Sequence, residues 1–410
     1  MMTKKSPQLR FEGFTDDWEQ RKLKEITSLI TKGTTPKDKS GKGEVNFIKV
    51  ENIDPFSGQI NDSSKISFEE HEGYLKRSQL KENDILFSIA GTLGRTSVIN
   101  KNLLPANTNQ ALAILRISEG KIPYIVTILK GRAVEDYIRK NPTVGAQPNL
   151  SLEQVGNLSI PFPSIPEQQQ IGTFFAHLDT LISLHQRKLD LLKEQKKGFL
   201  QKMFPKNGEK VPELRFAGFA DDWEERKLGE LALVLTGFPF KNEDFVDNGK
   251  YLVITNGNIQ NESSTVDVSL GNRVDDLSDE IKERYYLNKN DILVTMDGTV
   301  GRTAKVVDDN LILAQRVARL VANKNTEFVY QWLNQGSFFN EMTKVSHGGT
   351  IKHISLNEIS NYSATVPSNN IEQQKIGSFF KQLDDTIALH QRKLDLLKEQ
   401  KKGFLQKMFV

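Results

Sequence analysis

Two stretches of the chain, residues 166–204 and 371–410, place apolar side chains alternately four and three positions apart. The first stripe is Ile171, Phe175, Leu178, Ile182, His185, Leu189 and Leu192, and the second is Ile376, Phe380, Leu383, Ile387, His390, Leu394 and Leu397. A spacing of about 3.5 residues held over about four heptads is typical of a coiled coil, although a solitary amphipathic helix would also show a stripe. Pro166 and Pro205 stand where the first helix would begin and end. We predict two long helices that pair through these stripes.

Both stretches belong to a tandem repeat. The segment HQRKLDLLKEQKKGFLQKMF, from His185 to Phe204, returns unchanged from His390 to Phe409. The segment PQLRFEGFTDDWEQRKL at Pro7 returns as PELRFAGFADDWEERKL at Pro212, again 205 positions later. A duplicated chain closes most simply about a pseudo-twofold axis, which predicts antiparallel helices. A parallel pair would instead require the linker and the second globular region to span the helix length.

Between these blocks the two copies diverge and share only islands. NDILFSIAGTLGRTSVI at Asn83 corresponds to NDILVTMDGTVGRTAKVV at Asn290, and NLSLEQVGNLSIPFPS at Asn149 corresponds to HISLNEISNYSATVPS at His353. Apolar runs bounded by Gly, Asn, Asp and Pro predict strands joined by turns. The pattern therefore indicates one scaffold that carries two different surfaces.

Composition narrows the class of protein. The chain is 37% hydrophobic and 26% charged, with a net charge of +3 and no cysteine. This favours a globular protein of a reducing, cytoplasmic compartment and excludes disulfides and thiolate metal sites. No apolar run reaches the roughly 18 residues of a membrane span, and the amino terminus lacks the apolar core of a signal peptide. We expect no membrane partner.

No catalytic motif is present in the sequence. The patterns G-x-S-x-G, H-E-x-x-H and G-x-x-x-x-G-K-[ST] are absent, as is the Asp/Asn-Pro-Pro-aromatic segment of amino-methyltransferases. We therefore expect no catalytic residues and no metal site. His185 and His390 fall on the apolar stripes, where a polar layer that sets the register is favoured over metal ligation. The pairs Lys196–Lys197 and Lys401–Lys402 are interpreted as solvated faces near the helix ends, with phosphate binding as the alternative.

The divergent regions contain side chains that suit nucleic acid. Lysines and backbone amides bind phosphates, whereas Asn, Gln and Arg bind base edges. The candidates in the first copy are Lys32, Thr34, Lys37, Lys39, Lys42, Lys49 and Asn52, and those in the second are Lys241, Asn242, Asn256, Asn258, Gln260, Ser346, His347, Thr350, Lys352 and His353. Arg95 and Arg302 occupy matching GTLGRT and GTVGRT turns, which favours a scaffold role or a phosphate contact. Ordinary polar loops are the alternative interpretation of each residue.

The arrangement of these motifs resembles a known family. FEGFTDDWEQRKL at Phe11 and FAGFADDWEERKL at Phe216 precede the variable regions, while EQQQIGTFFAHLD at Glu167 and EQQKIGSFFKQLD at Glu372 open the helices. Over essentially its whole length the chain is similar to the specificity subunit of type I restriction–modification enzymes. The resemblance implies an α/β fold with two target-recognition domains, at residues 1–165 and 212–370. Two antiparallel coiled-coil helices at 166–204 and 371–410, with a linker at 205–211, would separate them in a pseudo-twofold internal repeat.

The resemblance also implies a function and partners. Each variable domain would read one half of a bipartite, asymmetric site in double-stranded DNA, and the helices would dock two methyltransferase subunits. The partners, not this chain, would bind S-adenosylmethionine, ATP and magnesium, and restriction subunits with translocase activity would complete the complex. No cofactor is expected on this chain.

Three other functions are left open by the residues themselves. The chain could be a two-headed DNA-binding adaptor without an enzyme partner, and co-purification of a methyltransferase would distinguish the two cases. It could be a self-contained restriction–methylation polypeptide, which the missing methyltransferase motif disfavours. It could be a structural coiled-coil protein, whose globular regions would show no preference for DNA.

Overall fold

The computed structural model describes residues 7–55, 57–141, 149–206, 208–260 and 263–409. Residues 1–6 of the amino-terminal segment and position 207 of the predicted linker lie outside these ranges. The chain forms two compact units, the first of residues 1–188 with 390–410 and the second of residues 189–389. The two long helices, α5 (Ile165–Met203) and α11 (Asn370–Met408), each contribute one part to each unit. This division differs from the predicted one, because the ends of both helices pack into the globular cores.

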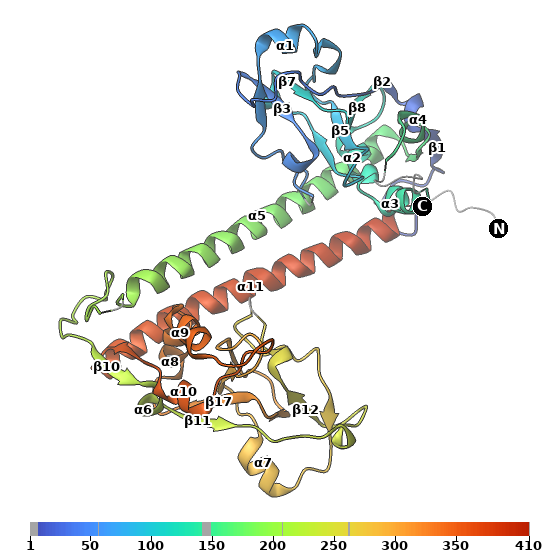
Figure 1. Cartoon of the computed structure of the whole chain (residues 1–410). Coiled ribbons are helices and arrows are strands. Elements are labelled where there is room, and N and C mark those ends of the chain that lie inside the picture. Colours follow the sequence, from blue (N-terminus) through green and yellow to red (C-terminus); the bar gives the residue numbers. More distant parts are fainter. Residues whose placement is uncertain (1–6, 56, 142–148, 207, 261–262, 410) are drawn as a thin grey trace. The chain divides into compact units, whose positions relative to one another are not determined.

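The first unit contains three small sheets (Figure 1). Its strands are β1 (Glu19–Lys22), β2 (Thr27–Lys32), β3 (Val45–Ile48), β4 (Ser64–Ile66), β5 (Ile85–Ser88), β6 (Thr96–Val98), β7 (Ala106–Thr108), β8 (Leu112–Ile117) and β9 (Ser159–Phe162). Its shorter helices are α1 (Phe68–Glu72), α2 (Ile122–Leu129), α3 (Arg132–Lys140) and α4 (Leu152–Gly156). The sheet orders are β2-β8-β5-β6, β4-β3-β7 and β1-β9, in which β3 and β7 are parallel and the other pairs antiparallel.

The second unit repeats this plan. Its strands are β10 (Glu224–Lys227), β11 (Ala232–Thr236), β12 (Tyr251–Ile254), β13 (Arg273–Val274), β14 (Ile292–Thr295), β15 (Thr303–Lys305), β16 (Leu311–Leu313), β17 (Val317–Ala322) and β18 (Ser363–Val366). Its helices are α6 (Leu228–Leu231), α7 (Asp279–Tyr285), α8 (Thr326–Leu333), α9 (Ser337–Val345) and α10 (Leu356–Asn361). The orders β11-β17-β14-β15, β13-β12-β16 and β10-β18 match those of the first unit one for one. The α/β fold predicted for both regions is confirmed.

The first of the shared islands contains an inner strand of the four-stranded sheet in each unit, β5 or β14. All four residues of β5, ILFS, are buried, and all four of β14, ILVT, are buried as well. Each is the third strand of its sheet. Because successive side chains point to opposite faces and all four are buried, both faces are covered, which suits a largely apolar run. The two copies therefore agree where a sheet interior demands apolar side chains.

The two repeated motifs bind each other within each unit. In the first unit Arg10 Nε and Nη2 donate to the two carboxylate oxygens of Glu167 at 2.6 and 2.8 Å, and Trp18 Nε1 donates to the same carboxylate at 3.2 Å. Glu167 is fully buried near the start of α5. In the second unit Arg215 makes the same paired contact with Glu372, at 2.6 and 2.8 Å. A two-point Arg–carboxylate bond fixes both position and orientation, so it anchors the leading segment to the helix.

A glycine follows the buried glutamate in each helix and allows a second helix to approach. A side chain at Gly172 would bring its Cβ within 2.6 Å of the backbone nitrogen of Tyr124 at the start of α2. At Gly377 the corresponding distance, to the backbone nitrogen of Phe328 in α8, would be 2.7 Å. Real Cβ atoms do not come this close, so only glycine permits this packing.

In each unit the parts of α5 and α11 pack antiparallel. In the first unit Phe174 contacts Phe404, with ring centroids 5.0 Å apart, while His185 lies opposite His390. The partner number falls as the α5 number rises, which defines the antiparallel direction. In the second unit Phe199 contacts Phe379 at 5.1 Å. On the predicted stripes Ile171, Phe175, Leu178, Ile182, Leu189, Leu192, Ile376, Phe380 and Leu394 are buried, and His185, Leu383, Ile387, His390 and Leu397 are half-buried.

A lysine of one helix pairs with an aspartate of the other in each unit. Lys401 Nζ lies 2.6 Å from Asp179 Oδ1 in the first unit, and Lys196 Nζ lies 2.6 Å from Asp384 Oδ1 in the second. Their lysine side chains are only 18% and 16% exposed. The prediction of solvated faces is therefore wrong for these two lysines, because their long stems carry the charge across to the partner helix. Lys197 and Lys402 are exposed as predicted.

His185 and His390 face each other in the first unit, with their Nδ1 atoms 3.0 Å apart. Loss of hydration lowers the pKa of His390, and repulsion from His185, Lys393 and Lys188 adds to this effect. A neutral ring can accept the hydrogen bond that its partner donates, which two imidazolium ions cannot do. Among the described residues no group of three or more His, Asp or Glu is placed to hold a metal ion. None of the helices in the described ranges has the length and the apolar composition of a transmembrane segment.

The buried Arg10–Glu167 pair makes a testable contribution to stability. Glu167→Ala leaves the guanidinium of Arg10 and the Trp18 donor without their shared acceptor. We expect the free energy of unfolding to fall by about 2–3 kcal/mol, below the usual range for a broken buried pair because the Arg10 side chain keeps some contact with water. Urea denaturation measures the change. The exposed Glu194→Ala is the control, and an equal effect of both substitutions would contradict the anchoring role.

Candidate nucleic-acid interface

The predicted residues of the first unit gather on the long loop between β2 and β3 and just after it. Lys32 ends β2, and the loop carries Thr34, Lys37 and Lys42; these three lysines are exposed. The loop is held against the segment that carries α1. Lys37 N donates to Glu70 Oε1 at 2.7 Å and its Nζ lies 4.6 Å from the Tyr74 ring centre. The structure thus places several of the predicted cations on one anchored loop.

Asn52 and Asn258 have a structural role that the sequence-based interpretation missed. Each ends a short 3-10 turn, at Val50–Asn52 and Asn256–Asn258. Asn258 is buried, accepts from Thr255 N, and donates to the carbonyl oxygens of Asp267 and Leu270 at 2.8 Å each. Asn52 accepts from Lys49 N at 2.8 Å and donates to Asp62 O at 2.6 Å. Both amides already help to close loops, and the proposal that they contact bases stays a prediction.

The matching arginines of the two GT-x-GRT turns differ in their surroundings. Arg95 Nη1 donates to the carbonyl oxygens of Val50 and Ile53, at 3.1 and 2.9 Å, so its guanidinium ties the GTLGRT turn to the 3-10 turn Val50–Asn52 and its C-cap. Of the two roles considered for Arg95, the structure favours the scaffold. Arg302 is half-buried, and its Nε has no hydrogen-bond partner among the described residues.

The predicted residues of the second unit fall in three places. Lys241 and Asn242 are exposed, and Lys241 pairs with Glu243 at 3.4 Å. Asn256 is half-buried, with an Oδ1 that has no partner in the described parts of the chain. His347, Thr350 and Lys352 are exposed on the loop that joins α9 to His353. Backbone bonds between His347 and His353, at 3.0 and 2.8 Å, close this loop.

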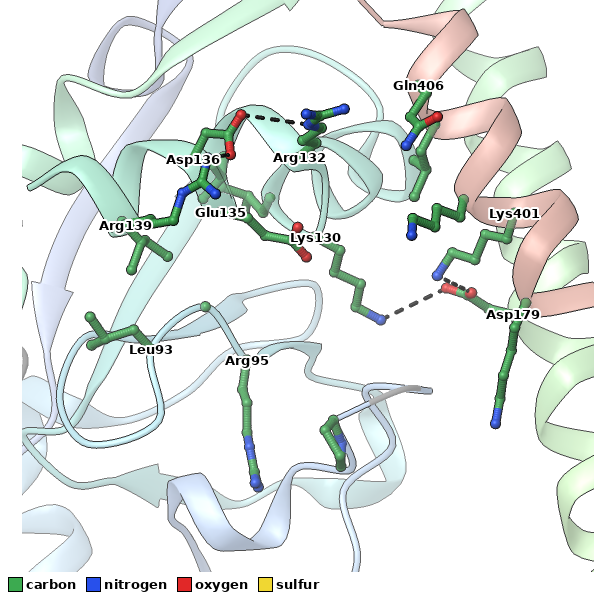
Figure 2. Close-up of a pocket in the computed structure, with 18 of the residues that line it drawn as sticks. Leu93, Arg95, Lys130, Arg132, Glu135, Asp136, Arg139, Asp179, Lys401 and Gln406 are labelled. Atoms are coloured by element: carbon green, nitrogen blue, oxygen red, sulfur yellow. Dashed lines mark hydrogen bonds and ion pairs between the residues drawn. The ribbon is translucent and has the colours of Figure 1, made fainter. Parts of the chain in front are cut away.

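A basic cleft of about 810 Å³ lies in the first unit between the GTLGRT turn, α3 and the carboxyl end of α11 (Figure 2). Seven cationic side chains line it against three carboxylates, so its walls are positively charged. The cations are Arg95, Lys130, Arg132, Arg139, Lys398, Lys401 and Lys402, and the carboxylates are Glu135, Asp136 and Asp179. We call this the basic cleft. Its charge and size suit a polyanionic backbone.

Ion pairs inside the basic cleft leave an excess of positive charge. Asp179 lies between two lysines, at 2.6 Å from Lys401 Nζ and 3.8 Å from Lys130 Nζ, as Figure 2 shows. Burial lowers the pKa of Lys130, an effect that Asp179 opposes. Asp136 likewise serves both Arg132 and Arg139, at 3.6 and 2.7 Å. Asp179 and Asp136 are each shared by two cations, and the seven cations outnumber the three carboxylates, so the cleft keeps an excess of positive charge.

Arg132 and Arg139 were missed as candidates in the sequence. Both lie on α3, seven residues apart and therefore on one face of the helix, and their side chains are 65% and 72% exposed. The periodic spacing of the two arginines in RAVEDYIRK was the available signal. What the sequence alone did not indicate is that α3 faces the carboxyl end of α11.

Comparison with known proteins identifies relatives over the whole chain. The family model described as "Type I restriction modification DNA specificity domain" matches twice, at residues 15–194 and 220–399. The putative type I restriction enzyme MjaX specificity subunit of Methanocaldococcus jannaschii is 25% identical over 410 residues, covering 95% of this chain and 92% of that protein. The type I restriction enzyme EcoBI specificity subunit of Escherichia coli is 30% identical over 177 residues, or 40% of this chain and 36% of that protein.

A solved structure shares the fold. The crystal structure of a type I restriction-modification system S subunit from M. genitalium aligns with a TM-score of 0.70 and 15% identity, covering 99% of both chains. At this level of identity the likeness concerns the fold, and it agrees with the repeated sheet plan of the two units.

If the basic cleft binds DNA phosphates, its exposed cations will contribute to the salt dependence of binding. Arg132→Ala, Arg139→Ala and Lys402→Ala should each make the slope of log K against log salt shallower by about 0.9, one phosphate contact each. The slope is measured on the assembled complex by fluorescence anisotropy between low and high salt. Arg284→Ala removes a similarly exposed, ion-paired arginine of α7 and should leave the slope unchanged. Unchanged slopes for all three cleft variants would exclude the cleft from the DNA contact.

Proposed function

The chain belongs to the type I restriction modification DNA specificity family, and from this premise we propose that its two units each read one half of a bipartite, asymmetric site in double-stranded DNA. As a specificity subunit it recognises DNA sequence and is itself non-catalytic. Methylation and cleavage would be carried out by partner subunits that it brings to the site.

The observation that carries this proposal is the contrast between scaffold and surface. Sheet order, the Arg–Glu anchor and the helices are the same in both units, whereas the loops that carry exposed cations and amides differ. A protein that needed one binding activity twice would have kept both surfaces alike. Two different surfaces on one frame suit a target whose two halves differ in sequence.

Exposed leucines on the paired helices are suited to docking partner subunits. In the first unit Leu184 of α5 and Leu396 of α11 are 55% and 54% exposed. In the second unit Leu191 of α5 and Leu389 of α11 are 52% and 51% exposed. Each unit thus shows one leucine from each helix at equivalent positions of the repeat. Exposed apolar side chains at equivalent positions of both units suit the docking of two copies of one methyltransferase subunit.

The proposal assigns every cofactor to the partners. S-adenosylmethionine would be held by the methyltransferase subunits, while ATP and magnesium would be held by restriction and translocase subunits that complete the assembly. The interiors of both units are filled by apolar cores, and the basic cleft opens to solvent. Such a cleft suits an extended polyanion better than an enclosed cofactor.

Mapping methylated bases across the host genome, with and without this gene, tests the proposed function. Methylation should depend on the gene and fall on a motif with two unlike halves separated by a spacer. Inactivating the partner methyltransferase should abolish the same methylation. This result distinguishes a specificity subunit from a self-contained enzyme. A genome whose methylation is identical in both strains would contradict the proposal.

Substitution of the exposed leucines tests docking. Leu184→Glu combined with Leu396→Glu places two charges on the helix surface of the first unit, and we expect one of the two methyltransferase subunits to be lost on co-purification. Leu270→Glu is a control for an exposed leucine, because Leu270 is also 54% exposed but belongs to the loop before β13 and not to α5 or α11. Mass measurement of the purified complex gives the stoichiometry. Full retention of both partners in the double variant would show that docking uses another surface.

A further inference from the structure

Three backbone segments of the second unit meet at one small platform. Met296 at the end of β14 donates its N–H to Arg316 O at 3.1 Å and accepts from Ile354 N at 2.9 Å. Gly298 N donates to Lys352 O at 2.8 Å, and Asp297 pairs with His353 through an isolated bridge. These bonds hold Asp297, Arg316 and His353 side by side although they lie far apart in the sequence. We call these three residues the platform triad.

The side chains of the platform triad are joined through the aspartate. Arg316 Nη1 donates to Asp297 Oδ2 at 2.6 Å, and His353 Nδ1 contacts Asp297 Oδ1. Burial alone would raise the pKa of Asp297, but the bonds from Arg316 and His353 outweigh it and hold the pKa below its ordinary value. The carboxylate is therefore charged and orients both neighbours. Its side chain is 12% exposed, whereas those of Arg316 and His353 are 62% and 39% exposed.

The first unit builds the same platform with different side chains. Ile89 N donates to Ala111 O at 2.8 Å, Leu150 N donates to Ile89 O at 2.8 Å, and Ala90 pairs with Asn149 through the matching bridge. Ala90, Ala111 and Asn149 thus occupy the places of Asp297, Arg316 and His353. Because two alanines and an asparagine support the same backbone hydrogen bonds, these bonds do not require the charged triad.

The backbone of Arg316 carries strain that packing does not explain. Its φ of 74° lies in the left-handed region, which non-glycine residues adopt at a cost. The side chain that this conformation positions is exposed and contributes nothing to a core. Strain held at an exposed, oriented side chain is typical of a functional site.

We propose that Arg316 is a specificity-determining residue that reads a guanine in the half-site of the second unit, with Asp297 as its positioning residue. The inference rests on the proposed function and deepens it. A guanidinium held in one orientation suits the paired O6 and N7 acceptors of guanine in the major groove. Contacts to phosphates can be the same in both units, whereas contacts to bases must differ if the two half-sites differ in sequence. The two half-sites would be distinguished at a place where the backbone hydrogen bonds are shared and the exposed side chains differ.

The test replaces Arg316 in the complete complex with its methyltransferase partners. Arg316→Gln should change the preference at a single base pair of the second half-site from guanine to adenine, because a glutamine amide matches the N6 and N7 groups of adenine. Arg316→Ala should lose discrimination at that base pair by roughly ten- to a hundred-fold and leave the first half-site unchanged. Binding to duplexes substituted at each position, together with methylation mapping in cells, gives the readout.

Asp297→Ala tests the positioning role. Discrimination should weaken at the same base pair as in Arg316→Ala and at no other, while the unfolding midpoint of the complex changes little. A purely structural role would instead lower the unfolding midpoint and weaken all positions alike. Arg284→Ala removes an arginine of similar exposure, paired with Glu280 at 3.5 Å, and should preserve the full motif.

The outcomes separate this inference from the proposed function. If no methylation depends on the wild-type chain, the proposed function itself fails. If methylation depends on the chain but Arg316→Gln leaves the motif unchanged, Arg316 does not read a base and only the inference is overturned. A uniform loss of affinity for every duplex in both Arg316 variants also overturns it, because that result identifies a phosphate contact.

Discussion

The buried bond between an arginine of the leading motif and a glutamate at the start of each long helix is the contact on which the rest of the structure depends. It joins residues 157 positions apart, Arg10 with Glu167 and Arg215 with Glu372. Between these two ends the chain forms a complete α/β region. The glutamates are buried, and each accepts two hydrogen bonds from its arginine. This contact fixes where the helix begins relative to the α/β region. Both motifs therefore recur together in the two copies.

The helix pair adds a second set of equivalent contacts. The same ion pair occurs in both units with the helices exchanged. In the first unit α5 supplies Asp179 and α11 supplies Lys401, and in the second α11 supplies Asp384 and α5 supplies Lys196. An ion pair among apolar contacts tolerates a shift of register less well than a continuous leucine seam, since a shift would leave a half-buried charge unpaired. The two lysines lie in the identical segments 185–204 and 390–409, so the same sequence makes the same ion pair in each unit.

The scaffold shared by the two units explains how their surfaces could diverge. At the platform of each unit the backbone hydrogen bonds are the same, while Ala90, Ala111 and Asn149 in one unit stand against Asp297, Arg316 and His353 in the other. Exposed positions supported only by backbone bonds can change without loss of core packing, so specificity can vary while the fold does not. The cleft that carries Arg132 and Arg139 follows the same rule, because its helix lysines belong to the repeated sequence and its α3 arginines to the variable one.

The sequence by itself determined the repeat, the two helices with their antiparallel pairing and the separation of scaffold from variable surface. These follow from periodicity and from an offset of 205 residues, which act along the chain and can be read there. The tertiary structure decided which side chains are free to act. Asn52 and Asn258 looked like base-reading amides and are used in loop closure, and Lys196 and Lys401 looked solvated and cross to the partner helix. Asp297, Arg316 and His353 meet only because three distant strands and loops exchange backbone hydrogen bonds, a proximity that no local pattern encodes.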